Sequence, residues 1–375
     1  MATSPRIAII GGGPGGLMLT RLLQVRGVPA AVFERDPHAG HRPQGGSLDL
    51  HVETGLRALR LAGLEAAFLA QARPEDQGDR LYDPSGALLY AHDGDGFERP
   101  EIDRTALKTI LLDSLEEGTV RWGAKVTEVR RGPGGGFEVI AQDGGAEVYD
   151  IVVGADGAWS QVRPLLSDVA PAYDGVVFAE LGFEAETHRF VDDLAGRGKM
   201  FAVGDNRVLV AQQNGGGHIR GYAGWRAPVA VARDLAGAPA DRVRAEMLRV
   251  FEGWAPALTD MTRQGEFLGV RLLYALPIDH RWETRPGLTL IGDAAHLMSP
   301  FAGEGVNLAL ADAADLAEAL ASGQGWGAVA HAEAVIAERA AAAAEESARG
   351  LQAAFSSAGA QRVLDHYRRR MVGQG

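Results

Sequence analysis

Hydrophobic residues at the start of the chain follow the pattern of a buried strand, a tight turn and a helix. Residues 6–10 are short, apolar and β-branched, and they lead into the glycine-rich segment Gly11–Gly16. Leu17–Arg26 follows with apolar residues at helical spacing and stops at Gly27, and Ala30–Phe33 is a second apolar strand. This change of period from strand to helix and back predicts a β-α-β unit.

Helical and strand-like segments continue to about residue 175. Thr54–Leu69 and Asp103–Leu115 have helical apolar spacing, and Asp103 stands where an N-cap would lie. Val120–Val129 alternates like a strand, and Ile151–Val153 is a short buried strand. The first half of the chain therefore predicts an α/β fold.

From Val176 to Leu276 the pattern becomes mainly strand-like. Met200–Val203, Arg207–Gln212 and His218–Trp225 have strand patterns, and one helix is predicted around Ala240–Glu252. The α/β character returns at residues 288–291, and residues 305–371 are mostly helical. Within that last stretch the glycines at 350 and 359 are expected to break or kink the helix.

Composition narrows the functional classes. The chain has 375 residues, 46% of them hydrophobic, which allows one large domain or two that share an interface. It contains no cysteine, which excludes disulfides, thiolate nucleophiles and cysteine-ligated metals. The histidines are scattered without the spacing of metal ligands, so we expect no metal site.

Charge and hydropathy argue against nucleic-acid and membrane partners. The net charge is −12, and the densest basic cluster, Arg368–Arg370, is interpreted as a solvated helix end. There is no apolar run of about 18 residues, and the N-terminus lacks the pattern of a signal peptide. We therefore expect a soluble, cytoplasmic protein, and a monomer.

The glycine-rich turn has the spacing of a dinucleotide-binding motif. Gly11 permits a tight turn, Gly13 lets a pyrophosphate approach the backbone, and Gly16 allows the helix to pack closely on the sheet. The helix N-terminus offers free N–H groups to phosphates. Glu34 ends the second strand, 18 residues after Gly16, where a carboxylate accepts hydrogen bonds from ribose hydroxyls. By itself the motif leaves FAD and NAD both open.

Two later motifs each place an aspartate at the carboxyl end of a strand. Asp156 lies in Gly154–Gly157 (GADG), and Asp293 lies in Gly292–His296 (GDAAH). In open α/β sheets ligands bind at this edge. His296 invites a catalytic role, but we interpret it as a packed, hydrogen-bonded residue.

With these three motifs in this order, the chain resembles the class A flavin monooxygenases, the family that includes para-hydroxybenzoate hydroxylase. The resemblance spans residues 6–320 and implies an α/β fold with a Rossmann-like (GR2-type) FAD-binding domain, an inserted β-rich substrate domain and a C-terminal bridging helix. The implied boundaries are 1–175 and 277–325 for the FAD-binding domain, 176–276 for the substrate-binding domain and 326–375 for the C-terminal helix.

The same resemblance implies which residues bind FAD. Asp293 is expected at the ribityl chain or the neighbouring phosphates, Asp156 at the pyrophosphate and the nicotinamide cofactor, and Arg104 at FAD. Residues 300–307 (PFAGEGVN) match the helix-opening loop beside the isoalloxazine, where glycine N–H groups stabilise negative charge on the flavin. The expected cofactor-binding set also includes Glu34, Arg35, Pro300, Gly303, Gly305, Val306 and Asn307.

Within the family, the chain resembles the tetracycline-inactivating flavin monooxygenases. The segment Arg42–His51 (RPQGGSLDLH) carries this most specifically, and it implies that Asp49 contacts FAD and that Arg42 faces the incoming nicotinamide cofactor. The central region matches less well, since Arg220 stands where the family has a histidine. The candidate substrate residues are Gln212, Arg220 and Phe301.

The implied reaction uses NADPH or NADH to reduce FAD, after which O2 gives a flavin C4a-hydroperoxide that hydroxylates an aromatic or polycyclic small molecule. Tetracycline and related polyketides are the candidate substrates, and no protein side chain is expected to be catalytic. Two alternatives stay open. One is another FAD oxidoreductase on this scaffold, a halogenase or a reductase, although the tryptophans lack halogenase spacing. The other is a non-catalytic drug-binding flavoprotein.

Overall fold

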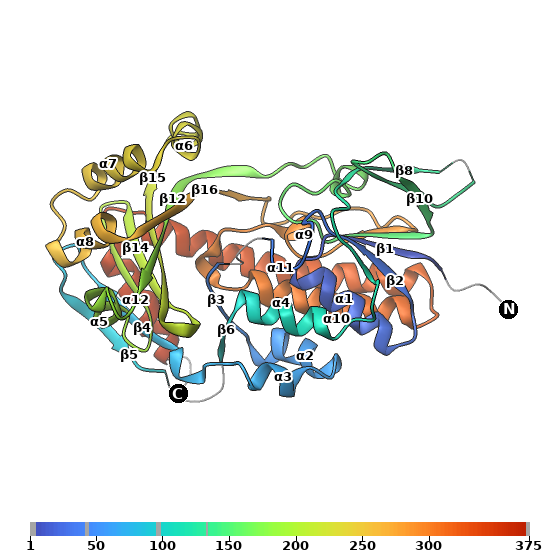
Figure 1. Ribbon diagram of the computed structural model, residues 1–375, viewed down its shortest axis with the longest axis horizontal. Helices are drawn as coiled ribbons and strands as arrows, with labels where there is room; N and C mark the ends of the chain where they lie inside the picture. Colours follow the sequence, from blue (N-terminus) through green and yellow to red (C-terminus); the bar gives the residue numbers. More distant parts are fainter. Residues whose placement is uncertain (1–4, 42–44, 95–98, 133, 373–375) are drawn as a thin grey trace.

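The computed structural model describes residues 5–41, 45–94, 99–132 and 134–372, and it places two sheets at opposite ends of an elongated molecule (Figure 1). The first sheet is parallel throughout. Its order is β17(Leu288–Leu290), β11(Ile151–Gly154), β1(Ile7–Ile10), β2(Ala30–Phe33) and β7(Val120–Arg121). Parallel sheets are covered on both faces, and β1, β11 and β17 are accordingly buried along their whole length.

Successive side chains of β1 point to opposite faces of this sheet and pack against two different layers. Ile7 and Ile9 face a core shared with the helices α1(Pro14–Val25), α4(Arg104–Asp113) and α10(Gly305–Ala321). Ala8 and Ile10 face a small antiparallel sheet on the other side. That sheet consists of β8(Val126–Arg131), β9(Phe137–Ala141) and β10(Ala146–Tyr149). The predicted β-α-β start and the α/β class are thereby confirmed.

The prediction of a single helix over residues 54–69 is wrong. This segment contains a helical turn, η1(Val52–Leu56), followed by the two short helices α2(Arg57–Leu61) and α3(Glu65–Leu69). The break falls at Gly63, whose φ of +71° lies in the left-handed region that suits glycine and ends helices. The strand predicted over 120–129 is likewise divided, between β7 and β8.

The second sheet has seven strands, and its order is not the order of the sequence. It runs β16(Glu266–Ala275), β12(Ala172–Glu184), β15(His218–Arg226), β14(Arg207–Gln213), β13(Gly198–Gly204), β4(Gly78–Tyr82) and β5(Leu88–His92). Strands β4 and β5 come from the segment that the sequence assigned to the FAD-binding domain. They join this sheet because β4 pairs in parallel with β13 along Gly78–Tyr82. The β-rich sheet therefore extends beyond the predicted range 176–276.

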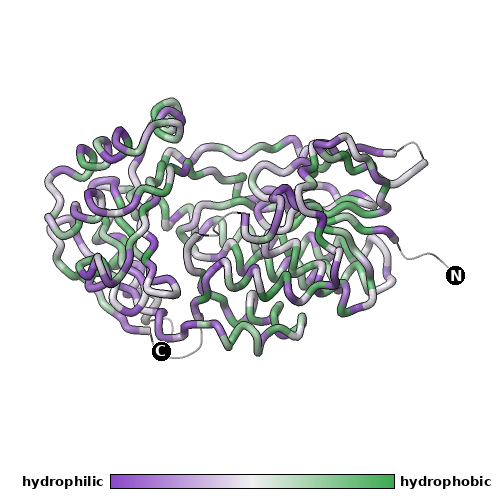
Figure 2. Tube along the Cα trace, in the orientation of Figure 1, coloured by the Kyte–Doolittle hydropathy of each residue, from purple (hydrophilic) through white to green (hydrophobic). Residues whose placement is uncertain are grey.

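Helices cover the outer face of the seven-stranded sheet. They are α5(Arg189–Ala195), α6(Val229–Ala236), α7(Ala240–Val250) and α8(Pro256–Gln264), where the sequence predicted one helix near 240–252. Figure 2 shows hydrophobic stretches along the strands and a largely hydrophilic outer helix α7. No helix among the described residues is long and apolar enough to cross a membrane.

Short elements complete the chain between the two sheets. Strands β3(Ser47–Asp49) and β6(Glu101–Asp103) form a two-stranded pair that lies between the two sheets. The remaining short helical elements are η2(Pro74–Asp76), η3(Arg163–Leu165), η4(Gly215–Gly217), α9(Asp293–His296) and η5(Pro300–Ala302).

A long C-terminal helix joins the two halves, as predicted. Helix α11(Trp326–Ala354) buries Val329 in the core of the FAD-binding half and Leu351 in the core under the seven-stranded sheet. It runs through Gly350 without a break, so the break predicted at this glycine is wrong. A Cβ there would lie 3.0 Å from the Cβ of Phe301, so close packing favours glycine at this position. The chain turns only after Phe355, and α12(Gly359–Val372) follows.

We expect Phe355→Ala to destabilise the protein by about 3 kcal/mol, the usual cost of deleting a buried aromatic ring. Phe355 is 2% exposed, and its ring contacts those of Phe178 and Phe301 at centroid distances of 6.3 and 5.7 Å. Urea unfolding measures the change. Val148→Ala, at a position 42% exposed on an edge strand, is the control. A loss below about 1 kcal/mol, typical of surface substitutions, would contradict the docking of this helix end.

Candidate active site

The glycine-rich turn after β1 is packed so tightly that two of its glycines have no room for a side chain. A Cβ on Gly11, where φ is +109°, would lie 2.3 Å from the carbonyl oxygen of Ala155. A Cβ on Gly16 would lie 2.1 Å from the carbonyl oxygen of Gly11. Gly13 differs, since a Cβ there would meet no atom within 4 Å. The turn thus leaves open space above Gly13 at the N-terminus of α1, which fits a dinucleotide pyrophosphate.

Glu34 lies at the end of β2 and holds this turn. It is 7% exposed, and its two carboxylate oxygens accept hydrogen bonds from the N–H groups of Gly12 and Asp36, each at 2.8 Å. A carboxylate has about four acceptor sites, so the geometry leaves acceptor capacity for ribose hydroxyls. Its neighbour Arg35 is exposed.

Asp156 caps the turn that follows β11. One carboxylate oxygen accepts the N–H of Gln161 at 2.7 Å, and the other is buried with no partner among the described residues. Burial raises the pKa of Asp156 above its ordinary value. Asp156 thus stabilises its own loop through one carboxylate oxygen, and the other oxygen is compatible with the predicted cofactor contact.

Asp293 and Arg104 are exposed side chains whose charges act on each other. Desolvation raises the pKa of Asp293 and lowers that of Arg104, and the attraction between the two charges opposes both shifts. Asp293 follows β17, the neighbour of β11, so the turns after β1, β11 and β17 meet at one edge. Gly13, Asp156 and Asp293 therefore lie along one edge of the sheet, an arrangement that fits FAD.

Residues 300–307 form the next part of the site. Gly303 has φ of +71°, and α10 begins two residues later at Gly305, where a Cβ would meet nothing within 4 Å. Pro300 is exposed and Val306 is half-buried. Asn307 is fully buried, and its side chain donates to the carbonyl of Asp49 and accepts the N–H of His51, both at 2.9 Å. Asn307 thus ties the start of α10 to the end of β3.

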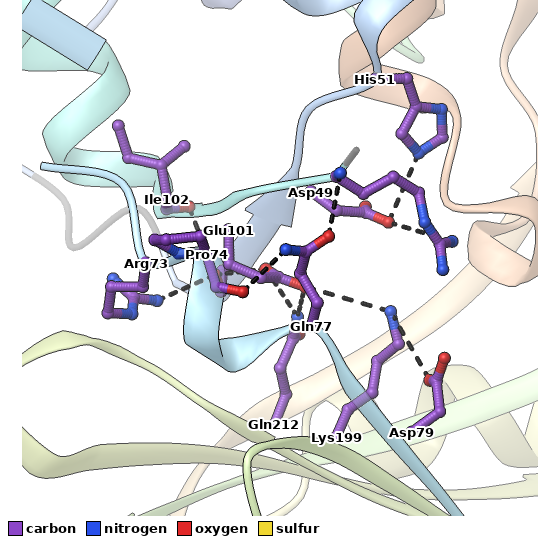
Figure 3. Close-up of polar contacts among 12 residues, drawn as sticks. Asp49, His51, Arg73, Pro74, Gln77, Asp79, Glu101, Ile102, Lys199 and Gln212 are labelled. Atoms are coloured by element: carbon purple, nitrogen blue, oxygen red, sulfur yellow. Dashed lines mark hydrogen bonds and ion pairs between the residues drawn. The ribbon is translucent and has the colours of Figure 1, made fainter. Parts of the chain in front are cut away.

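A set of charged and amide side chains lies between this loop and the seven-stranded sheet (Figure 3). We call it the interface cluster, and it consists of Asp49, Asp79, Glu101, Lys199 and Gln212. The Lys199 ammonium lies 3.9 Å from a carboxylate oxygen of Asp79 and 4.0 Å from one of Glu101. Gln212 donates to Glu101 at 3.3 Å.

Two carboxylates of the interface cluster, Glu101 and Asp49, have opposite pKa shifts. Desolvation raises the pKa of Glu101 to about 7 despite the nearby Lys199. Burial also acts to raise the pKa of Asp49, but Lys199, His51 and Arg99 together outweigh it and hold the value below the ordinary range. For Lys199 itself, burial is outweighed by the three carboxylates, so its pKa is raised. Lys199 and Asp49 are therefore charged at neutral pH, whereas Glu101 is near half-ionised.

Two of the predicted substrate residues, Gln212 and Arg220, lie on the inner face of the seven-stranded sheet, and the third, Phe301, lies in η5. In the strand register Lys199 stands opposite Gln212, and Gln212 stands opposite Arg220, so the three side chains form one row. Arg220 lies 3.9 Å from Glu180 of β12. Phe301 packs on Phe178 at a ring distance of 6.2 Å. Arg42, the predicted contact of the nicotinamide cofactor, lies outside the described residues.

Two other expectations have definite outcomes. Asp103 precedes α4 but does not cap it, because its carboxylate accepts the N–H of Gly215 at 3.0 Å and pairs with Arg73 at 2.9 Å. His296 is buried, with its Nε2 2.5 Å from an oxygen of Asp312. It is thus the packed, hydrogen-bonded residue that the sequence predicted.

Comparison with known proteins identifies the family. A sequence model described as an FAD binding domain matches residues 5–348. The chain belongs to this FAD-binding family. The monooxygenase asqM of Emericella nidulans is 33% identical over 372 residues, which cover 84% of this chain and 83% of asqM. The chain is therefore an FAD-dependent monooxygenase.

Solved structures agree on the fold. The crystal structure of an FAD-containing monooxygenase from Photorhabdus luminescens superposes with a TM-score of 0.78 at 25% identity, covering 94% of this chain and 99% of that one. A tetracycline destructase superposes with a TM-score of 0.73 at 18% identity, covering 100% of this chain and 96% of that one. The predicted resemblance to class A flavin monooxygenases is confirmed.

Gly13→Ala separates cofactor binding from folding. Because a methyl group at Gly13 meets no protein atom within 4 Å, we expect unfolding of the apoprotein to be nearly unchanged. The methyl group would occupy the space of the pyrophosphate, so FAD affinity is expected to fall by about 100-fold, roughly two charge-assisted hydrogen bonds. Flavin fluorescence titration measures the affinity, and Gly40→Ala, in an exposed loop, is the control. Equal FAD affinity in Gly13→Ala would rule out this turn as the pyrophosphate site.

Glu101→Gln should remove the part of the loss of folding stability with rising pH that is due to ionisation of Glu101. The pKa of Glu101 is about 7 in the folded protein and about 4.5 when unfolded, so the folded state holds one more proton between these values. Wild-type stability should therefore fall relative to the variant as pH rises from 4.5 to 7, by at most about 1.4 kcal/mol per pH unit, and then level off. Chemical unfolding at several pH values tests this, with the exposed Glu345→Gln as control. Parallel profiles for wild type and Glu101→Gln would show that Glu101 is ionised as in water.

Proposed function

We propose that this monooxygenase uses NADPH or NADH and O2 to hydroxylate an aromatic or polycyclic small molecule that carries a polar edge. The observation that carries the proposal is the inner face of the seven-stranded sheet. Its polar row is Asp79, Lys199, Gln212 and Arg220, and the next row on the same face is Leu81, Phe201, Val210 and Tyr222. A wall that changes from polar to apolar within two residues per strand suits a flat ring system with polar groups along one side.

The cofactor residues described above would hold FAD along the edge of the parallel sheet. Gly11 and Gly16 would shape the turn and Gly13 would receive the pyrophosphate. Glu34 would bind the ribose, and Asp293 with Arg104 the middle of the molecule. The N–H groups at the start of α10 would face the flavin. When bound, FAD supplies the electron transfer from the nicotinamide and the activation of oxygen, which side chains cannot supply.

The protein contributes position and environment. Asp49, held by Asn307, would border the flavin, since a carboxylate oxygen of Asp49 lies 3.7 Å from where a Cβ on Gly303 would be. Phe301, packed on Phe178, would shield the reacting region from water. We assign cofactor binding to residues 1–175 and 277–325 apart from β4 and β5, and substrate binding to 176–276 together with these two strands. Residues 326–375 join the two parts.

Tetracycline is one candidate substrate, supported by the resemblance of residues 42–51 and by the shared fold. Arg220 argues for a wider search, because a guanidinium prefers carboxylate, enolate or phenolate oxygens over neutral groups. The guanidinium of Arg220 also lies beside Gly45, 3.1 Å from where a Cβ on that glycine would be. We therefore place aromatic polyketides with acidic hydroxyl groups on the same panel.

The test is to load the enzyme with FAD and follow NADH and NADPH oxidation with a panel of tetracyclines and aromatic polyketides. A substrate-stimulated rate and a product heavier by one oxygen atom are expected. Arg220→Ala should lower kcat/KM by about tenfold, the loss of one charge-assisted contact, at unchanged FAD content. The exposed Arg233→Ala on α6 is the control. Substrate turnover without oxygen in the product would favour a halogenase or reductase, and tight substrate binding without NAD(P)H oxidation would favour a drug-binding flavoprotein.

A further inference from the structure

His51 lies between two carboxylates that come from the two segments bordering the flavin site. Its Nε2 is 3.4 Å from an oxygen of Asp49, at the end of β3, and its Nδ1 is 3.1 Å from an oxygen of Glu304, just before α10. Its backbone N–H donates to Asn307. Figure 3 shows the ring of His51 beside Asp49, with the contact drawn. Neither the sequence motifs nor the proposed chemistry assigns this histidine a role.

The geometry determines the charge of the ring. A neutral imidazole has one N–H donor and one acceptor nitrogen, whereas both nitrogens of His51 face carboxylate oxygens, which only accept. Both nitrogens must therefore carry a proton for the two contacts to be favourable. The side chains of His51, Asp49 and Glu304 are 20%, 16% and 23% exposed, so water replaces little of this interaction.

We infer that His51 is a positioning residue for the flavin loop: its imidazolium bridges Asp49 and Glu304 and holds residues 300–305 against β3 in the arrangement that retains FAD. The inference rests on the proposed placement of FAD beside this loop. Without the cation, two carboxylates would face each other across the site, and one attachment of the loop would be lost. Among the described residues, the hydrogen bonds of the Asn307 amide to Asp49 and His51 would still connect α10 to the end of β3.

The charged groups around His51 set the pH at which this bridge fails. Asp49 and Glu304 face the ring directly, Arg99 lies 3.8 Å from Asp49, and Lys199 acts on Asp49 from β13. Burial alone would lower the pKa of His51, but the contacts with Asp49 and Glu304 outweigh it and raise the value from 6.5 to about 9. A raised histidine pKa contributes stability that is full below about pH 6.5 and is lost as pH rises through 9.

The test is the rate of FAD release from the FAD-loaded protein, followed by recovery of flavin fluorescence from pH 6 to 10. Wild type should release FAD faster as pH rises, with a midpoint near 9. His51→Gln should release it about tenfold faster at pH 7, the loss of one charge-assisted hydrogen bond, and should lack that pH step. NMR titration of the imidazole in wild type and Glu304→Gln gives a second readout, since removal of the Glu304 charge should lower the pKa of His51.

His218→Gln is the matched control. His218 also contacts a carboxylate, Glu184 at 2.8 Å, but the two side chains are 64% and 56% exposed on the seven-stranded sheet. It should release FAD as wild type does. If His51→Gln does not fold, the rate of FAD release from Glu304→Gln is compared with that of wild type instead.

The outcomes separate this inference from the proposed function. A raised His51 pKa together with wild-type FAD retention in both variants would overturn the positioning role and leave the monooxygenase proposal intact. An ordinary His51 pKa would overturn the bridge itself. A wild-type protein that binds FAD but neither oxidises NAD(P)H nor oxygenates any substrate would instead remove the proposed function.

Discussion

The close backbone approach at the carboxyl ends of β1 and β11 is the constraint on which the rest of the structure depends. Gly11 can come this near to the carbonyl of Ala155 only because it lacks a Cβ and has positive φ. That approach sets where α1 begins, and Gly16 then seats the helix against the same turn. The open space above Gly13 and the position of Glu34 follow from it. A site for a dinucleotide is thus a consequence of packing at three positions, and no large side chain is needed to build it.

Local features of the fold could be predicted, whereas long-range pairings could not. The β1-α1-β2 unit is encoded within its own residues, as a change of hydrophobic period around a glycine turn. Strands β4 and β5 were not assigned to the second sheet, because the pairing of β4 with β13, which brings both strands into it, joins residues more than a hundred positions apart in sequence. Nothing in residues 78–92 taken alone indicates that partner. Helix α11 was predicted as a bridge, but its continuity through Gly350 was not, because the packing against Phe301 that favours glycine there exists only in the folded structure.

The same distinction holds within the site. The cofactor end was predictable because its motifs are contiguous and each has a physical reason for its glycines and aspartates. Asp49 and Gln212 were predicted separately, but the interface cluster as a whole was missed, since it needs the register of β4, β13 and β14 together with β3 and β6. One signal was available: Lys199 is a lone cation in the apolar strand Gly198–Gly204, and its burial implies paired charge nearby. His51 gave no such signal, because its two carboxylate partners lie 2 and 253 residues away.

The electrostatics of the interface cluster show how one buried cation serves two carboxylates unequally. Asp49 is stabilised as an anion by Lys199, His51 and Arg99, so its charge persists at every physiological pH. Burial is the main cause that raises the pKa of Glu101 to about 7, Lys199 opposes the rise, and the charge of Asp49 adds to it. An anionic substrate group placed beside Lys199 would add a further negative charge next to Glu101 and raise that pKa again. Binding of such a substrate would therefore be coupled to proton uptake by Glu101, and a neutral substrate of the same shape would lack this coupling.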